Sequence, residues 1–372
     1  MMKSSATSLF FFNPNQGNLD AAILQQLPFV FAESESGPEP RGDSYRSPVS
    51  EASSMSDIPT FYSGKSIFVT GGTGFLGKIL VYKLLKSCPG VESIYLLIRP
   101  KRGVEPQERL ENLFSNSVFD DLRKRQLLSK IRAVSGDVTL PKLGMSDEDE
   151  AEIRRKVSVI FHSAATVKFD EDLTKSVAMN VGGTKYIMDL ARQLDRLSAV
   201  VHVSTAYCNC HSPSISESFY PLDTSPLKIL AESSAPGASK RMDTEAFTRQ
   251  MVGKRPNTYT FTKALAEKLV REEGEGMPVA IVRPSIVVAA LEEPAPGWID
   301  NLNGPTGEKR SIITFFTPSQ VELGMNNRYG SFQNELHVKR ALDILLSTKV
   351  GLSTSRQEYE HEMGLPSYET KR

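Results

Sequence analysis

The stretch "SIFVTGGTGFLGKILVYKLL", residues 66–85, constrains the fold of this chain more than any other. An apolar run of strand length enters a glycine-rich turn, and a helical pattern follows at once. Gly71, Gly74 and Gly77 are spaced three residues apart. Glycines at this spacing let the backbone approach a pyrophosphate, which then lies at the positive N-terminus of the helix. The stretch predicts dinucleotide binding, and a turn chosen only for tight strand–helix packing is the alternative.

Apolar runs of strand length alternate with helical stretches from Lys65 onward, which is typical of a parallel sheet with crossover helices. We expect helices after Phe75, across 106–130, across 173–194 and from 257 to about 273. We expect six strands, at 66–70, 93–98, 131–136, 157–164, 199–205 and 279–285. The predicted fold class is α/β, a doubly wound parallel sheet of Rossmann type with helices on both faces.

The composition changes at both ends of this pattern. Residues 1–60 are rich in Ser, Pro, Glu and Gly, so burial cannot offset the entropy of ordering them, and we expect a disordered N-terminal arm. Residues 61–307 form the predicted nucleotide-binding domain. Residues 308–372 form an atypical tail with one amphipathic helix near 335–346.

Charge and cysteine content limit the classes of partner. The chain has 44 basic and 44 acidic residues, which gives no reason to expect nucleic-acid binding. Three cysteines cannot form a disulfide framework and indicate a reducing, intracellular compartment. The five histidines are scattered, so we assign no metal. The most apolar long window carries Arg283 and Pro284 in its middle, which indicates a buried strand and loop instead of a membrane span.

Several residues are candidates for holding the cofactor. The second strand ends in "YLLIRPKR", where Arg99, Lys101 and Arg102 could pair with a 2'-phosphate, so the sequence favours NADPH. An ordinary solvated basic loop is the alternative. Asp137 follows the third strand, where it could accept a hydrogen bond from adenine. The full candidate set is Thr70, Gly71, Gly72, Thr73, Gly74, Phe75, Leu76, Gly77, Arg99, Asp137, Val138, Ala164, Ala165, Asn180, Lys263 and Pro284.

The candidate catalytic residues are Tyr259, Lys263 and the hydroxyls of Ser204 and Thr205. Tyr259 and Lys263 are four residues apart on an expected helix, so they share one face. Tyr82 and Lys86 have the same spacing, but they lie on the first crossover helix and are expected to be structural. Ser204 and Thr205 end the fifth strand at the carboxyl edge of the sheet, where a nicotinamide would lie. We expect His162 to be a packing residue or to support the site without touching the substrate, instead of being catalytic.

Together these segments resemble the fatty acyl-CoA reductases, alcohol-forming enzymes of the extended short-chain dehydrogenase/reductase superfamily. The resemblance covers residues 61–307. It rests on "KSIFVTGGTGFLGKILVYKLL", "IYLLIRPKRG", "VIFHSAATVKFDEDL", "VHVSTAYCNC", "YTFTKALAE" and "RPSIVVAALEEPAPGWIDNLNGPTG". The last segment is the most specific, because a general dehydrogenase has no reason to carry it.

The resemblance implies reduction of a long-chain acyl-CoA to an alcohol through an aldehyde, with NADPH as the hydride donor. Tyr259 would protonate the developing alkoxide, while Lys263 would lower the pKa of the tyrosine and hold the nicotinamide ribose. Thr205, with Ser204 as the less favoured choice, would donate a second hydrogen bond to the same oxygen. A covalent route through Cys208 is a much weaker alternative.

The sequence departs from the family after Gly307, where the rest of the substrate region and a helical C-terminal domain are expected. We therefore expect a truncated or divergent chain. Two other functions stay open: another extended dehydrogenase acting on a sugar nucleotide or steroid, and an NADPH-binding protein without turnover. Relatives of this kind are found at peroxisomal or endoplasmic reticulum membranes, but this chain shows no evident transmembrane helix, and its sequence indicates no oligomeric state.

Overall fold

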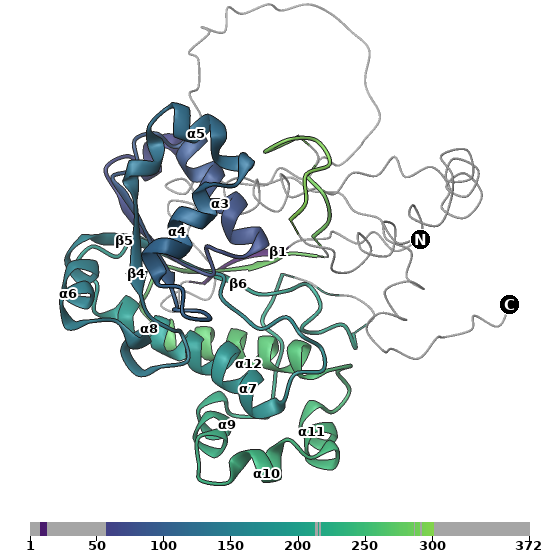
Figure 1. Cartoon of the computed structure of the whole chain (residues 1–372). Helices are drawn as coiled ribbons and strands as arrows, with labels where there is room; N and C mark the ends of the chain where they lie inside the picture. The colour runs from purple at the N-terminus through teal and green to yellow at the C-terminus, as the bar shows by residue number, and fades with distance from the viewer. Residues whose placement is uncertain are drawn as a thin grey trace, which may run out of the picture.

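The computed structural model describes residues 8–12 and 57–300, apart from 213, 214, 216, 286 and 291. The tail at 308–372, with the helix expected near 335–346, lies outside the described residues. Figure 1 shows the described part as a sheet with helices on both sides.

Six parallel strands form the sheet, as the sequence predicts. They are β2 (Ser66–Thr70), β3 (Ser93–Ile98), β4 (Ile131–Ser135), β5 (Val157–His162), β6 (Ala199–Val203) and β7 (Val279–Arg283). Their spatial order is β7-β6-β5-β2-β3-β4, so the chain first winds outward from β2 and then returns to β5 on the other side. Ligands of such sheets bind at the carboxyl ends of the strands where the winding reverses. The reversal here lies between β2 and β5.

A seventh strand lies within the expected N-terminal arm. The segment β1 (Ser8–Phe12) pairs antiparallel with β7, with Ser8 opposite Arg283 and Phe12 opposite Val279. These five residues therefore belong to the sheet. The reason lies in the segment "SLFFF", whose aromatic residues favour strands and whose backbone can satisfy the open edge of β7.

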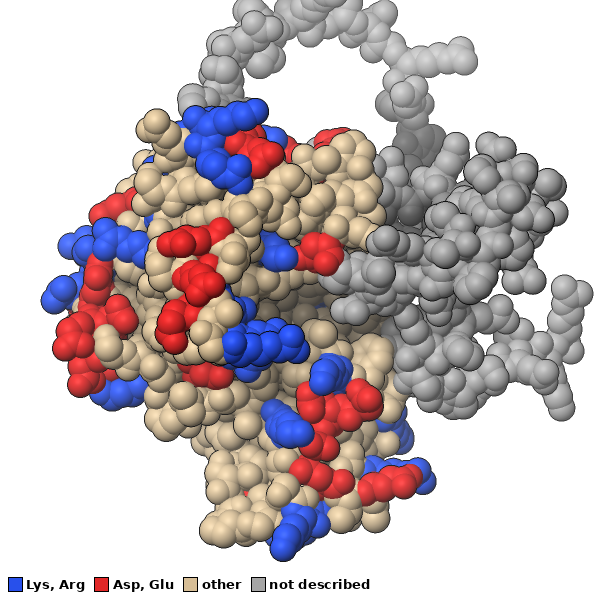
Figure 2. Space-filling view, in the orientation of Figure 1, with Lys and Arg blue, Asp and Glu red and all other residues tan. Residues whose placement is uncertain are grey.

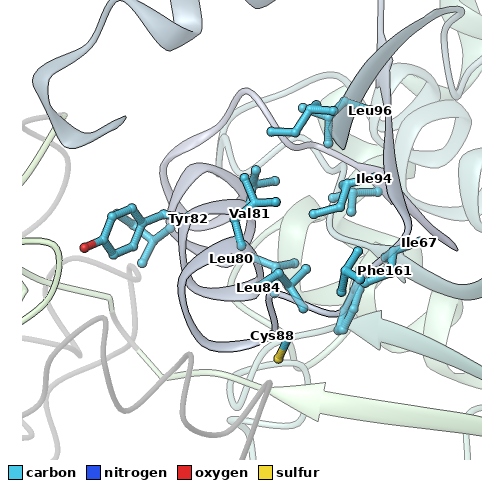
Figure 3. Close-up of a cluster of buried hydrophobic side chains, with 14 of the residues drawn as sticks. Ile67, Leu80, Val81, Tyr82, Leu84, Cys88, Ile94, Leu96 and Phe161 are labelled. Carbon is cyan, nitrogen blue, oxygen red and sulfur yellow. The ribbon is translucent and has the colours of Figure 1, made fainter. Parts of the chain in front are cut away.

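One face of the sheet is covered by α2 (Asp57–Tyr62), α3 (Phe75–Ser87), α4 (Pro106–Phe114) and α5 (Asp120–Lys124). Figure 3 shows Leu80 and Leu84 of α3 facing Ile94 and Phe161 of the sheet. The region expected to be helical across 106–130 is divided into α4, two 3-10 turns (Ser117–Phe119 and Leu127–Lys130) and α5. The Asn116 side chain, which accepts from the Val118 amide at 3.1 Å, starts a new turn there.

The opposite face is covered by α6 (Asp147–Lys156), α8 (Gly183–Arg192) and α12 (Thr258–Glu273). The helix expected across 173–194 is three consecutive segments: α7 (Leu173–Ser176), a π-helical turn (Val177–Gly182) and α8. Figure 1 shows α7 and α12 on the side of the sheet away from α3 and α5.

Three short helices pack beyond α12 and form a smaller core with it. They are α9 (Pro226–Ser233), α10 (Ala238–Met242) and α11 (Glu245–Val252), and they pack on Phe261, Leu265 and Leu269 of α12. They lie at the lower edge of Figure 1. Helix α12 is thus held from two sides, by the sheet and by these helices. No helix in the described part of the chain is long and apolar enough to cross a membrane.

Candidate functional site

The turn between β2 and α3 is shaped in a way that only glycine permits. Gly71 has φ +73°, and a Cβ added to it would lie 2.7 Å from the amide nitrogen of Ala164. A Cβ on Gly77 would lie 2.2 Å from the Gly71 carbonyl oxygen. Both approaches are too close for any side chain, so the turn stays flat against β5 and the first turn of α3. The N-terminal amides of α3 are thereby left open to a phosphate group.

A cavity of about 640 Å³ begins at this turn and follows the carboxyl ends of the strands. Figure 2 shows a hollow on this face of the molecule, with Lys and Arg side chains along its rim. Most of the residues predicted from the sequence line the cavity: Gly71, Thr73, Gly74, Phe75, Leu76, Gly77, Arg99, Asp137, Val138, Ala164, Ala165, Ser204, Thr205, Tyr259, Lys263 and Pro284. The cavity thus joins the glycine turn to the Tyr259–Lys263 pair.

Three predicted cofactor residues are not among the lining residues. The Thr70 hydroxyl instead accepts from the Ala164 amide at 3.2 Å and lies 2.8 Å from His162 Nδ1. Gly72 packs closely on Leu96, since an added Cβ would lie 3.0 Å from a Leu96 methyl group. Thr70 and Gly72 therefore contact residues next to the cavity without lining it themselves.

Asn180, the third of them, lies on the π-helical turn and is buried. Its Oδ1 accepts from the Thr166 amide at 2.9 Å, and its Nδ2 donates to the Thr166 carbonyl at 3.2 Å and to Thr262 Oγ1 at 2.9 Å. It therefore holds the loop after β5 against α12 without facing the cavity.

A basic group borders the cavity near the end of β3. Arg99 and Lys101 line it as the sequence suggests, but Arg102 does not, and Arg109 of α4 does. Arg109 donates to the Arg99 carbonyl oxygen at 2.5 Å. Burial, and then the charge of Arg99, lower the pKa of Arg109, as expected where cations converge. Sequence reasoning missed Arg109, which lies ten residues beyond Arg99 on another element.

Asp137 is already engaged within the protein. Its Oδ1 accepts from the Thr139 amide at 2.9 Å and from the Thr139 hydroxyl at 2.8 Å, and its Oδ2 lies 3.5 Å from Arg99. The carboxylate also lines the cavity, so it can orient Arg99 and still face a bound base.

Helix α12 presents Tyr259 and Lys263 to the cavity. Asn257 caps the N-terminus of the helix, and its side chain accepts from the Thr260 amide at 2.9 Å. Lys263 is 4% exposed, and its Nζ donates to the Val203 carbonyl oxygen at 2.6 Å. Burial lowers the pKa of Lys263 to about 8, although the charge of Glu267 opposes this shift.

The Tyr259 hydroxyl differs from the sequence expectation. Lys263 was expected to lower its pKa, but burial raises the pKa of Tyr259 to about 12, and a hydrogen bond with the Thr205 side chain only partly opposes this. The reason is geometric, because the Lys263 ammonium is directed at the Val203 carbonyl. The tyrosine is consequently held in its protonated form, the form that a proton donor requires.

The hydroxyls and the thiol after β6 have different surroundings. Ser204 Oγ donates to Glu267 Oε1 at 2.5 Å, whereas Thr205 is paired with Tyr259. Thr205 is therefore the hydroxyl better placed to share a substrate oxygen with the tyrosine. Cys208 is buried, its thiol donates to Glu267 at 3.3 Å, and burial raises its pKa well above the usual value. This environment contradicts the covalent route, because the thiolate is the nucleophilic form.

Tyr82 and Lys86, the second pair with the same spacing, lie away from the cavity. Lys86 donates to the Tyr82 hydroxyl at 3.0 Å and lies 3.1 Å from Glu293. Figure 3 shows the Tyr82 ring on the side of α3 away from Ile94 and Phe161. The contacts of His162 also indicate a structural role. Threonine hydroxyls lie within hydrogen-bond distance of both ring nitrogens, and burial lowers the pKa of the side chain to about 3.

The comparisons with known proteins agree with this geometry. The model of an NAD-binding domain described as "Male sterility protein" matches residues 69–326, most of the chain and all of the cavity. The chain belongs to the male sterility protein family. Membership in this family confirms a nicotinamide cofactor, for which the glycine turn and the cavity have the required shape.

The curated relatives that resemble the chain include fatty acyl-CoA reductases, which confirms the resemblance seen in the sequence. "Fatty acyl-CoA reductase 1" of Mus musculus is 47% identical over 258 residues, covering 68% of this chain and 49% of the mouse protein. The Xenopus laevis protein of the same name is 45% identical over 255 residues, with the same coverage. The chain thus spans about half the length of the curated relatives it matches.

The solved structures that resemble this chain include reductase domains. The terminal R domain from the myxalamid PKS-NRPS biosynthetic pathway is 27% identical, with a TM-score of 0.47, over 64% of this chain and 53% of that chain. The reductase domain of a nonribosomal peptide synthetase from Mycobacterium tuberculosis is 24% identical, with a TM-score of 0.43, over 63% and 51% of the two chains.

Proposed function

We propose that this chain carries the catalytic half of an NADPH-dependent reductase that converts long-chain acyl-CoA to fatty alcohol through an aldehyde. The observation that carries the proposal is the single cavity that joins the glycine turn to Tyr259, Lys263 and Thr205. A site with these groups can bind a nucleotide and can place a proton donor beside the carbonyl group that is reduced. The names of the relatives supply the substrate class.

The residues divide the chemical work as follows. NADPH supplies hydride when bound. Tyr259, protonated at neutral pH because its pKa is about 12, donates a proton to the oxygen that gains negative charge. Thr205 donates a second hydrogen bond to that oxygen, and a donor of this kind contributes about 3 kcal/mol to a transition state. Lys263 provides the positive charge beside the cofactor ribose.

NADPH is preferred over NADH in this proposal because cations converge where the ribose 2'-phosphate would lie. Arg99, Lys101 and Arg109 line the cavity just after β3, the strand whose end contacts this ribose in Rossmann folds. No acidic residue takes the place at the end of β3 that an NAD-preferring enzyme uses for the 2'-hydroxyl.

A second candidate function is NADPH binding without turnover. The chain spans about half the length of its curated relatives, so about half of each relative lies outside the matched region. The cofactor cavity does not depend on that half, because its described lining lies within residues 71–287.

Replacing Tyr259 with Phe tests the proposal. We expect NADPH consumption with a long-chain acyl-CoA to fall at least about a hundredfold, because a positioned proton donor contributes about 10²- to 10⁴-fold. Consumption is followed at 340 nm, and the lipid products are extracted and identified. NADPH affinity should stay within about twofold of the parent, since the lost hydroxyl is a proton donor rather than a cofactor anchor.

The matched control is Tyr82→Phe, which removes a hydroxyl at the same Tyr-x-x-x-Lys spacing but outside the cavity. It should leave turnover unchanged. Equal rates for the parent and Tyr259→Phe would disprove the catalytic role. A parent chain that binds NADPH but forms neither aldehyde nor alcohol would support the second candidate function.

A further inference from the structure

A buried ion pair lies directly behind the candidate catalytic residues. Glu267 of α12 is 4% exposed, and Arg283, the last residue of β7, is 1% exposed. Arg283 donates from Nε to Glu267 Oε1 at 2.8 Å and from Nη2 to Oε2 at 2.7 Å. A two-point contact fixes the orientation of both side chains. Because burying two charges is seldom favourable for stability alone, the location of the pair calls for a functional explanation.

The same carboxylate reaches the end of the neighbouring strand. Glu267 Oε1 also accepts from the Ser204 hydroxyl at 2.5 Å and from the Cys208 thiol at 3.3 Å. One side chain therefore ties α12 to the carboxyl ends of β6 and β7. The proton of Ser204 is used in this contact, so Thr205 is the neighbouring hydroxyl that meets Tyr259.

Glu267 also follows Lys263 by one helical turn, on the same face of α12. The other titratable groups that interact with Lys263 come from β5, β6 and the turn after β6: His162, His202 and Cys208. Burial lowers the pKa of both histidines and raises the pKa of the thiol, so all three are neutral near pH 7. Glu267 is thus the anion among these described groups, and it opposes the desolvation of the Lys263 ammonium.

We propose that Glu267, oriented by Arg283, is a positioning residue of the site that sets the protonation of Lys263 and assigns the substrate-facing hydroxyl to Thr205. The proposal rests on the proposed function for its purpose. Its test does not, because the protonation of Lys263 can be read without cofactor, substrate or turnover.

The test compares Glu267→Gln with the parent chain by NMR of ¹³C-labelled lysine, following the Cε signal of Lys263 between about pH 6 and about pH 10. The signal is assigned by its loss in Lys263→Arg. The parent midpoint should lie at about 8. Without the carboxylate charge, the ammonium loses its favourable partner, so the midpoint should fall to about 7, a tenfold change in proton affinity.

Two variants serve as controls. Glu267→Asp keeps the negative charge, so its midpoint should stay near that of the parent. Glu272→Gln removes a carboxylate from the same helix that is half exposed and 3.8 Å from Lys268, so the Lys263 signal should not move. Merely structural damage at position 267 would affect Glu267→Asp and Glu267→Gln alike.

A folded Glu267→Gln variant whose Lys263 titrates at the parent midpoint would overturn the proposal. Should that variant fail to fold, Glu267→Gln combined with Arg283→Met removes both buried charges and leaves neither unpaired. The Arg283 charge offsets part of the Glu267 charge in the parent, so the double variant should show a smaller fall, and an unchanged midpoint there would equally overturn the proposal. If the fall is seen in a chain without turnover, the positioning role stands while the proposed reductase activity fails.

Discussion

At the scale of single residues, the proposed preference for NADPH rests on the basic group of Arg99, Lys101 and Arg109. Arg109 is the informative member, because Arg99 is partly neutralised by Asp137 at 3.5 Å. The pKa of Arg109 is lowered by burial and by its cationic neighbour, so a bound anion would relieve an unfavourable arrangement. A 2'-phosphate has the charge that such a group selects.

Replacing Arg109 with Gln should weaken NADPH binding about tenfold and leave NADH binding nearly unchanged. The expected size follows from one charge-assisted hydrogen bond, about 1.5 kcal/mol. Fluorescence titration of the reduced nicotinamide measures both dissociation constants. Arg102→Gln is the matched control, because Arg102 belongs to the same basic loop but does not line the cavity. Parallel losses for NADPH and NADH would show that Arg109 does not contact a 2'-phosphate.

At the scale of elements, the π-helical turn Val177–Gly182 places Asn180 between the loop after β5 and α12. All of its side-chain contacts are to Thr166 and Thr262, so its effect on the cavity is through the position of that loop. A π turn is rare and is often found beside functional sites, where it reorients one side chain.

Asn180→Ala should lower the free energy of unfolding by about 2 to 3 kcal/mol, because it leaves buried partners without their hydrogen bonds. Urea denaturation measures the change, and NADPH titration of the folded variant should show weaker binding as the loop relaxes. Asn112→Ala, on the exposed side of α4, is the control and should change stability by less than about 0.5 kcal/mol. Equal stability of the two variants would contradict the bridging role of Asn180.

The same scale shows why parts of the fold could be predicted. Strands β2, β3, β5 and β7 are buried along almost their whole length, because both faces of the sheet are covered, and the apolar runs that result are visible in a sequence. Helix α6 was missed, since its sequence "DEDEAEIRRK" buries a single apolar residue, Ile153, and shows almost no helical periodicity. The break between α4 and α5 depends on one side chain, Asn116, and leaves no periodic signal.

The parts of the candidate site that could be predicted are those whose residues lie close together in the sequence. The glycine turn and the Tyr259–Lys263 pair each lie on one segment, and the alternative pair at Tyr82 and Lys86 was separated by its place along the chain. Arg109 and the Glu267–Arg283 pair were not predicted. Their contacts join different elements, and only the packing of α4 and α12 on the sheet brings the partners together.

At the scale of the whole molecule, the cofactor cavity and the core depend on the same elements. Helix α3 follows the glycine turn directly and supplies the leucines that cover β2, β3 and β5. Helix α12 supplies Tyr259 and Lys263 on one side and packs on α9, α10 and α11 with the other. A ligand that fills the cavity therefore contacts segments whose positions require the folded sheet, so binding and unfolding must be linked.

NADPH at about a hundredfold its dissociation constant should raise the free energy of unfolding of the full chain by about 2.7 kcal/mol. For a domain of this size the melting temperature should rise by about 5 to 10 °C. Differential scanning fluorimetry measures the shift, with NADH and AMP at the same concentration as controls. Tyr259→Phe should keep the full shift, since its hydroxyl serves chemistry and not cofactor affinity. A chain that melts at the same temperature with and without NADPH would show that the glycine turn does not bind the cofactor, and both candidate functions would then fail together.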